Sequence, residues 1–179
     1  MDLQTLYETE FDFVWRSLRR LGVPESDLSD AIQEVFMTAH RKLPEFEGRA
    51  KFSTWLFQIA FGVASTRKRR AYRRHEVIDW SLLEECCSDE ISPEDSLFFR
   101  ESVALLDRAL DELSLEQRSV FILFELEEVP CEEIAATLGI PVGTVYSRLR
   151  LGRAAFQRAL RQLRGQTTRI NRIAAGSSS

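Results

Sequence analysis

A tight turn between two helical patterns restricts the fold of this chain more than any other sequence feature. Residues 138–141 read Leu-Gly-Ile-Pro and lie between a short apolar helical pattern and a longer one. Gly139 permits the left-handed backbone conformation that such a turn needs, and Ile140 and Val145 are spaced to pack the second helix against the first. The spacing predicts a helix-turn-helix over residues 132–153.

The second helix of this predicted motif is strongly basic. Six arginines and no acidic residue lie between Pro141 and Arg164. Early residues of a recognition helix point at base edges, while Ser, Thr and Arg side chains also bind phosphates. The pattern therefore predicts a surface that binds duplex DNA, and a solvated basic face is the alternative interpretation. The predicted DNA-binding residues are Thr144, Ser147, Arg148, Arg150 and Arg153.

The rest of the chain also has helical periodicity. Apolar residues recur at helical spacing from the start of the sequence. A second helix is expected after Pro24, with Ser26 or Asp27 as its cap, and a third is expected to be capped by Ser53 or Thr54. Because no alternating strand pattern of any length occurs, the expected fold class is all-α.

The third predicted helix and its approach combine aromatic and basic residues. Lys51, Phe52 and Trp55 lie at its start, and residues 67–70 are all basic. Aromatic platforms beside a positive groove suit single-stranded nucleic acid. The alternative is that Trp55 or Phe57 is simply a core residue, which is expected of one of the two.

An acidic stripe lies on one face of the second predicted helix. Asp27, Asp30 and Glu34 are helical neighbours, because they are three, four and seven residues apart. Such a stripe is a docking face for a basic protein partner, a metal or acid–base site, or a solvated surface. Only His40 lies nearby as a further ligand, and the sequence has no Gly-rich phosphate loop and no nucleophile–base set. We therefore expect no enzymatic activity, no metal and no cofactor.

The formal net charge of −4 hides a strong segregation of charge along the chain. Residues 76–99 contain eight acidic residues and no basic one, whereas the flanking segments are slightly basic. This composition predicts a flexible acidic linker. The expected organisation is two small helical domains joined by that linker and followed by a disordered tail: 1–75, 76–100, 101–165 and 166–179.

The cysteines and the hydropathy of the chain indicate the cellular compartment in which it is expected to lie. Cys86, Cys87 and Cys131 fit no zinc spacing, and we expect free thiols in a reducing compartment, with a redox sensor as the alternative. No uncharged apolar run is long enough to cross a membrane, and the first residues lack the apolar core of a signal peptide. These features predict a cytoplasmic protein without membrane insertion.

Several segments resemble one known family. DLSDAIQEVF at 27–36 and KFSTWLFQIA at 51–60 resemble region 2 of bacterial sigma factors of the extracytoplasmic-function (ECF) group. Residues 111–156, which include LGIPVGTVYSRL at 138–149, are similar to region 4 of the same group. The resemblance covers most of residues 5–163. It implies a sigma-70-type factor that binds core RNA polymerase and directs promoter recognition, DNA melting and transcription initiation.

The resemblance also implies roles for particular residues. Those expected to dock on the β′ clamp helices of the polymerase are Asp27, Asp30, Gln33, Glu34 and Phe36. Those expected to capture the single-stranded −10 element are Lys51, Phe52, Ser53, Thr54, Trp55, Gln58 and Arg67. The basic helix would read the −35 duplex, and the acidic linker would lie near the active centre of the polymerase. Further implied partners are the polymerase β flap and an anti-sigma factor, which in some cases holds such a protein at the membrane.

Three positions depart from the family pattern. Gly62 stands where many members carry Asn, Ala31 where Leu is usual, and Tyr146 where a basic residue is common. These departures concern promoter sequence and strength of melting. Two other functions stay open at this stage: a stand-alone helix-turn-helix regulator with an N-terminal sensing or dimerising domain, and an adaptor that binds polymerase or a signalling partner and barely touches DNA.

Overall fold

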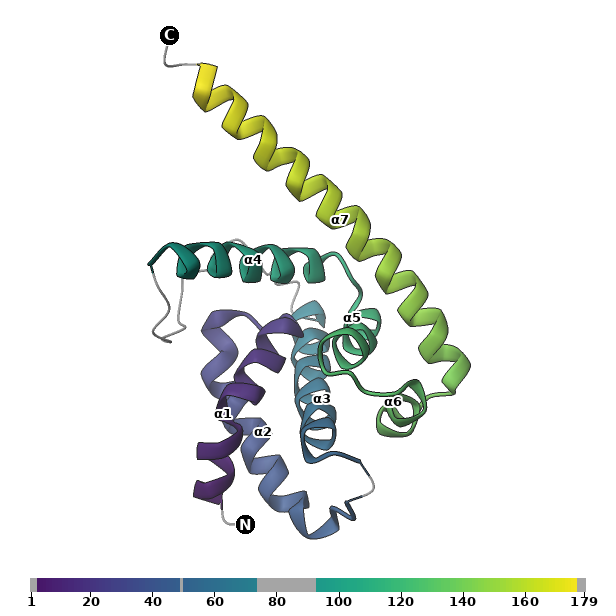
Figure 1. The fold of residues 1–179 in the computed structure, drawn as a ribbon. Helices are drawn as coiled ribbons and strands as arrows, with labels where there is room; N and C mark the ends of the chain where they lie inside the picture. The colour runs from purple at the N-terminus through teal and green to yellow at the C-terminus, as the bar shows by residue number, and fades with distance from the viewer. Residues whose placement is uncertain (1–2, 49, 74–92, 177–179) are drawn as a thin grey trace.

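Three long helices form the N-terminal half of the protein (Figure 1). The structure, a computed structural model, describes residues 3–48, 50–73 and 93–176, and the described part contains helices and turns but no strand. The three helices are α1 (Leu3–Arg20), α2 (Glu25–Lys42) and α3 (Phe52–Arg73), and the short 3-10 turn η1 (Leu43–Glu45) follows α2. Their facing sides bury a continuous apolar core that includes Leu6, Val14, Leu18, Val35, Leu56 and Phe57. The predicted all-α fold class is confirmed.

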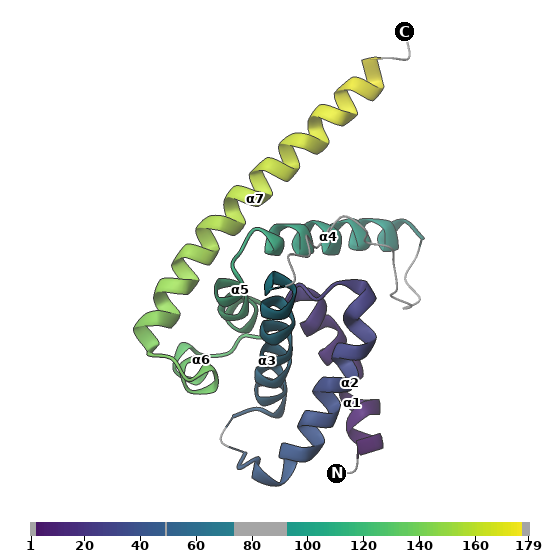
Figure 2. The same cartoon turned by 180° about the vertical axis from the view of Figure 1, so that it is seen from behind.

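The C-terminal half contains four helices among the described residues. They are α4 (Pro93–Asp111), α5 (Leu115–Phe121), α6 (Cys131–Leu138) and α7 (Val142–Gly176), with the π-helical turn η2 (Ile122–Leu126) after α5. In both views α4 crosses the end of the N-terminal bundle, α5 and α6 stand beside α3, and α7 projects away from the body (Figures 1 and 2). The core of this half includes Leu110, Val120, Ile134, Val145 and Leu149.

Local sequence signals explain most helix ends in the C-terminal half. Ser114 caps α5 through a capping box in which its side chain accepts from the Gln117 N–H and the Gln117 side chain accepts from the Ser114 N–H. Gly139 ends α6 with φ of 64°, in the left-handed region where residues with a Cβ are strained. Both helices of the predicted helix-turn-helix are therefore present, at α6 and α7.

Two predicted caps are wrong. Helix α2 begins at Glu25, with Pro24 at the N-cap and no side-chain cap. Helix α3 begins at Phe52, before both of its expected caps, and the Trp55 N–H bonds to the Lys51 carbonyl at 3.1 Å. Pro at a helix start is already set at a helical φ and has no N–H to satisfy, so a helix can start there without a capping side chain.

Two predicted boundaries also differ from the structure. Helix α4 begins at Pro93, so its first eight residues lie in the segment expected to be linker; residues 74–92 lie outside the described part. Helix α7 continues to Gly176, whereas a disordered tail was expected from residue 166. This stretch contains no proline, and a glycine such as Gly165 costs a helix only about 1 kcal/mol, so helical hydrogen bonding continues through it.

Candidate nucleic-acid interface

The first turns of α7 present the predicted duplex-binding residues on the side away from the core. Val145 and Leu149 are buried against α5 and α6. Ser147 and Arg150 are exposed, and Thr144 and Arg148 are half-buried at the edge of the same face. The exposed part of this surface thus combines hydroxyl and guanidinium groups, which bind base edges and phosphates in DNA complexes.

Two of these side chains already have partners inside the protein. The Ser147 hydroxyl donates to the Gly143 carbonyl at 2.9 Å. The Arg153 guanidinium pairs with Glu125 and lies 5.1 Å from the centroid of the Phe124 ring. In this structure η2 places an acid and an aromatic ring beside Arg153, and its role as a DNA-binding residue stays a prediction.

Tyr146 lies on the outer face of α7 and was not expected to be a contact residue. Its side chain is 53% exposed. The negative charge of Glu132, followed by Cys131, raises the pKa of its phenol above the ordinary value. An exposed aromatic ring with a hydrogen-bond donor thus replaces the more usual basic side chain.

An aromatic cluster forms the approach to α3. The rings of Phe46, Phe52 and Trp55 lie with centroids 5.1 to 5.4 Å apart, and all three side chains are half-buried. Phe57 is fully buried. Of Trp55 and Phe57, one was expected to be a core residue, and the structure shows that it is Phe57. The ring of Trp55 stays partly exposed at the surface.

A groove of about 480 Å³ runs beside this cluster. Its lining comes mainly from α2 and α3 and includes Thr38, Trp55, Gln58 and Gly62, and Leu138 of α6 also contributes. Of the predicted single-strand residues, Trp55 and Gln58 line this groove together. Lys51 is exposed and Ser53 is half-buried, and neither of them lines it. Thr54 is not at the surface, because it is 2% exposed and faces the core.

Arg67 faces the acidic stripe rather than the aromatic cluster. Its Nη2 lies 3.2 Å from Oε2 of Glu34, and its Nη1 lies 3.8 Å from Oδ2 of Asp27. Helices α2 and α3 pack side by side, and this brings the C-terminal turns of α3 next to the start of α2. The structure thus separates Arg67 from the residues with which the family resemblance grouped it.

The predicted polymerase-docking residues divide into surface and core. Asp30 and Gln33 are exposed, and Asp27 and Glu34 are half-buried beside Arg67. Phe36 is 2% exposed, and its ring centroid lies 4.8 Å from that of Tyr7. Phe36 is therefore a core residue of the N-terminal bundle and does not belong to the exposed face of α2.

A cluster of charged residues joins the two halves of the chain, and sequence reasoning missed it. Nε of Arg19 lies 3.1 Å from Oδ2 of Asp107, and Nη1 of Arg20 lies 3.4 Å from Oε1 of Glu127. Nη1 of Arg118 lies 3.1 Å from Asp111 and donates to the Arg20 carbonyl at 3.5 Å. Helix α1 is thereby tied to α4, to α5 and to the segment after η2.

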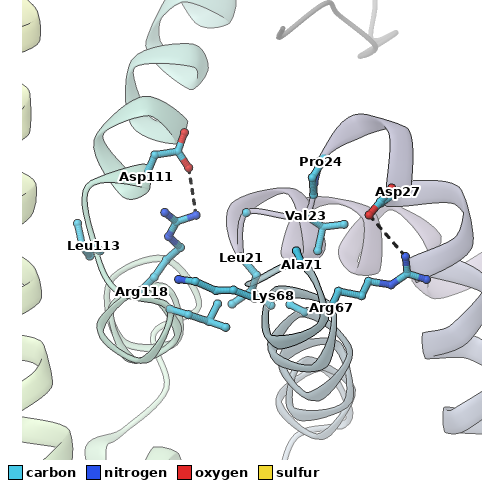
Figure 3. A pocket seen from close by; sticks show the side chains of 13 residues that line it. Leu21, Val23, Pro24, Asp27, Arg67, Lys68, Ala71, Asp111, Leu113 and Arg118 are labelled. Atoms are coloured by element: carbon cyan, nitrogen blue, oxygen red, sulfur yellow. Dashed lines mark ion pairs between the residues drawn. The ribbon is translucent and has the colours of Figure 1, made fainter. Parts of the chain in front are cut away.

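Burial changes the titration of this cluster. It raises the pKa of Asp107 above the ordinary value, and the positive charges of Arg19, Arg20 and Arg118 only partly oppose the shift. Burial also raises the pKa of Asp111 and lowers that of Arg118. A cavity of about 200 Å³ lies at this junction, where Arg118 points toward Asp111 and Arg67 toward Asp27 (Figure 3).

The described residues form neither a metal-type cluster nor a membrane-spanning helix. No group of three or more His, Cys, Asp or Glu side chains is placed to hold a metal ion in the described part, so the acidic stripe does not form such a group there. None of the described helices is long and apolar enough to cross a membrane.

Comparison with known proteins matches two parts of the chain to the same family. Residues 6–74 match the family described as Sigma-70 region 2, and residues 104–156 match Sigma-70, region 4. The chain is 32% identical to the ECF RNA polymerase sigma-E factor of Escherichia coli (strain K12) over 148 residues, which is 79% of this chain and 78% of that protein. It is 31% identical to the ECF RNA polymerase sigma factor SigW of Bacillus subtilis (strain 168), covering 90% and 89% of the two chains.

A solved structure also aligns over most of the chain. It is the sigma factor RpoE from Bartonella quintana, in complex with the anti-sigma factor NepR. The TM-score is 0.61 with 25% sequence identity, and the alignment covers 87% of this chain and 96% of that one. The likeness therefore extends across both helical halves.

Proposed function

Because the chain belongs to the ECF sigma factors of the sigma-70 family, we propose that its two helical halves read promoter DNA in two different physical states. Sigma factors act in promoter recognition and transcription initiation, and this chain does so as a member. In our proposal the halves form separate domains, over residues 1–75 and 101–165. The chain itself catalyses no reaction, and the polymerase makes the RNA.

The start of α7 is proposed to read the −35 element as duplex. Thr144, Arg148 and Arg150 supply hydroxyl and guanidinium donors on one face of a helix that follows a turn, and Ser147 joins them where its hydroxyl leaves the Gly143 carbonyl. This is the geometry with which such motifs enter the major groove. Arg153 joins them only where DNA displaces Glu125 from its guanidinium.

The surface around Trp55 is proposed to take the −10 element as single strand. Its support is the partly open ring of Trp55 within an aromatic cluster, beside the exposed Lys51 and Gln58. Unstacked bases gain roughly 1–3 kcal/mol each by stacking on such rings. Gly62 on the wall of the groove has no heavy atom near its missing Cβ, so the groove stays open there.

The exposed part of α2 is proposed to dock on the β′ clamp helices of core polymerase. Asp30 and Gln33 form its open part, while Asp27 and Glu34 share Arg67 at its edge. The C-terminal half would contact the β flap. Docking both halves on one polymerase raises their effective concentration at correctly spaced promoter elements, so weak individual contacts suffice.

An anti-sigma factor is proposed as a further partner, and it would keep the chain in the cytoplasm or hold it at the membrane. The support is the similarity to a structure in which a sigma factor is bound to its anti-sigma factor. Pull-down from the native host with the tagged full chain, followed by membrane and soluble fractionation, tests this part.

One observation carries the proposal: the duplex-type surface and the single-strand-type surface lie on different halves of one chain that matches both sigma regions. The test is in vitro transcription with purified core polymerase on a genomic promoter library. We expect new start sites that depend on the chain and share two spaced elements. Duplex binding without polymerase and no new start sites would favour a stand-alone regulator instead.

A further inference from the structure

The cavity at the junction of α3 and α5 is lined by three positive side chains, two acidic ones and apolar walls. Its volume is about 200 Å³, and its cations are Arg67 and Lys68 of α3 and Arg118 of α5. We propose that this cavity binds a small phosphate group, either free inorganic phosphate or the phosphate of a small monoester. The inference goes beyond the proposed function and depends on neither of the two DNA-binding surfaces.

The size of the cavity limits the ligand to a small molecule. One buried water needs roughly 10–15 Å³ of cavity, so a volume of about 200 Å³ has room for a group of several heavy atoms. Pockets that take drug-sized ligands hold about 300–1,000 Å³. A phosphate or a small monoester therefore fits the cavity better than a nucleotide does.

Arg118 lines the cavity and keeps part of its guanidinium without a partner. It is 6% exposed, and its Nη1 contacts both Asp111 at 3.1 Å and the Arg20 carbonyl at 3.5 Å. Its Nε is buried and has no hydrogen-bond partner. Because a buried donor without a partner is unfavourable, and because a guanidinium binds phosphate oxygens through paired N–H groups, a phosphate is a suitable acceptor for it.

The two cations of α3 also have donors to spare. Nε of Arg67 is buried without a hydrogen-bond partner, while its Nη atoms pair with Asp27 and Glu34. Lys68 lines the cavity and is exposed, and none of the described acidic side chains forms an ion pair with it. Figure 3 shows the Lys68 side chain extending from α3 toward the helix that carries Arg118. An ammonium group placed in this way is a point charge for a phosphate.

The charges that line the cavity favour an anion. Asp27 and Asp111 are the two acidic lining residues, and each of them is already paired with an arginine. The lining therefore has one more positive than negative charge, and the unpaired charge is that of Lys68. Because water screens charges less in a partly buried site, an anion gains more there than beside the exposed arginines of the protein surface.

The first experiment measures binding of inorganic phosphate to the full-length protein. Isothermal titration calorimetry, at an ionic strength held constant with sodium chloride, gives the stoichiometry and the Kd. We expect saturable binding of one phosphate per chain. The Tm should rise with phosphate concentration, because a ligand that binds only the folded state stabilises it. Acetate, which is planar and carries a single charge, is the matched control and should produce neither effect.

The second experiment locates the site with three variants. Lys68→Gln should weaken phosphate binding about threefold to tenfold, because one charge-assisted contact is lost. Lys42→Gln, the same change at an exposed lysine of α2 outside the cavity, should change the affinity less than twofold. Ala71→Leu places an apolar side chain in the cavity without changing any charge, and should weaken binding more than tenfold. Thermal unfolding without phosphate shows that each variant is folded.

Glycerol phosphate distinguishes the two sources of the phosphate group. Binding as tight as that of inorganic phosphate identifies a site for a monoester, and much weaker binding identifies free phosphate as the ligand; both results support the inference. The absence of saturable phosphate binding, or the same effect with acetate, would overturn it.

The variants give two further outcomes that would contradict a site in the cavity. Equal affinities for Lys68→Gln and Lys42→Gln would mean that Lys68 does not hold the anion. Unchanged binding in Ala71→Leu would mean that phosphate adsorbs on exposed basic residues outside the cavity. The proposed reading of promoter DNA stands or falls separately, because the transcription assay tests it without reference to this site.

Discussion

Nη2 of Arg67 lies 3.2 Å from Oε2 of Glu34, so the C-terminal turns of α3 are joined to the middle of α2. The guanidinium also lies 3.8 Å from Asp27. This basic residue therefore neutralises part of the proposed polymerase-docking face. Since all three side chains are partly exposed, each pair is worth about 1 kcal/mol or less.

This geometry predicts the effect of removing Arg67. Arg67→Ala should lower the free energy of unfolding by roughly 1 kcal/mol, since two partly exposed pairs are lost. The affinity for the −10 single strand should fall less than twofold. Urea denaturation and fluorescence anisotropy measure the two quantities. A loss of strand affinity above fivefold would mean that Arg67 leaves the acids and contacts DNA.

The duplex-binding face of α7 predicts an asymmetry between two arginines. Arg148→Ala should weaken binding of a −35 duplex by about fivefold to a hundredfold, because a direct base contact is worth roughly 1–3 kcal/mol. Arg158→Ala, an exposed position on the same helix well beyond its first turns, should have a small effect. Electrophoretic mobility shift with matched and mutated −35 duplexes tests this. Unchanged discrimination between these duplexes in Arg148→Ala would remove Arg148 as a reader.

The turn of the helix-turn-helix predicts opposite effects for two glycines. Gly139→Ala should destabilise the C-terminal half by roughly 1–2 kcal/mol, because Gly139 has φ of 64° and a Cβ is strained there. Gly143→Ala should stabilise it by roughly 0.5–1 kcal/mol, because Gly143 is inside α7 and has open space for a Cβ. Thermal unfolding of both variants measures the difference. Equal shifts would contradict the backbone explanation.

The buried carboxyl of Asp107 predicts a pH dependence. Its pKa in the folded protein is raised above the ordinary 3.8 by burial, so the folded state binds this proton more tightly than the unfolded chain does. The stability that protonation of Asp107 contributes is fully present below pH 3.8, the pKa of the unfolded chain. It is lost as the pH rises through the higher pKa of the folded protein. Between pH 3.8 and the raised pKa, the free energy of unfolding of the wild type should therefore fall relative to that of Asp107→Asn, which cannot titrate at this position.

Urea denaturation of both proteins, from pH 3.8 up to neutrality, gives the comparison for Asp107. The informative quantity is the slope of the stability difference with pH, since the substitution also changes the contact with Arg19 by a constant amount. A difference that moves in favour of the wild type as the pH rises would mean that the charges of Arg19 and Arg118 outweigh burial.

Local chemistry made much of the fold predictable. The predicted turn at Gly139 depends on residues close together in the sequence, and the structure contains it. Phe36 shows where a family resemblance gave less than the local structure does: the resemblance implied a docking residue, whereas the side chain is buried in the core.

Contacts between distant segments were not predictable in the same way. Periodicity shows which face of a helix is buried but not which other helix covers it, so the pairing of Arg19 with Asp107 has no local signature. The same holds for Glu133, whose partner Lys51 is on another helical unit. Arg67 was grouped with DNA-binding residues for this reason, although packing of α3 on α2 turns it toward Glu34.

Helix α7 is one unbroken element, so its packing in the core sets the orientation of the face proposed to bind the −35 duplex. Leu149 and Ala155 anchor one side of the helix in the core, and a Cβ at Gly152 would already contact Leu113 at 3.4 Å. Each residue of an α-helix advances about 100° around the axis. A core substitution that rolls α7 would thus rotate Ser147 and Arg150 together, and preference at several base pairs would change in concert. We therefore expect substitutions in the apolar contact between α5 and α7 to change which promoter sequences are preferred.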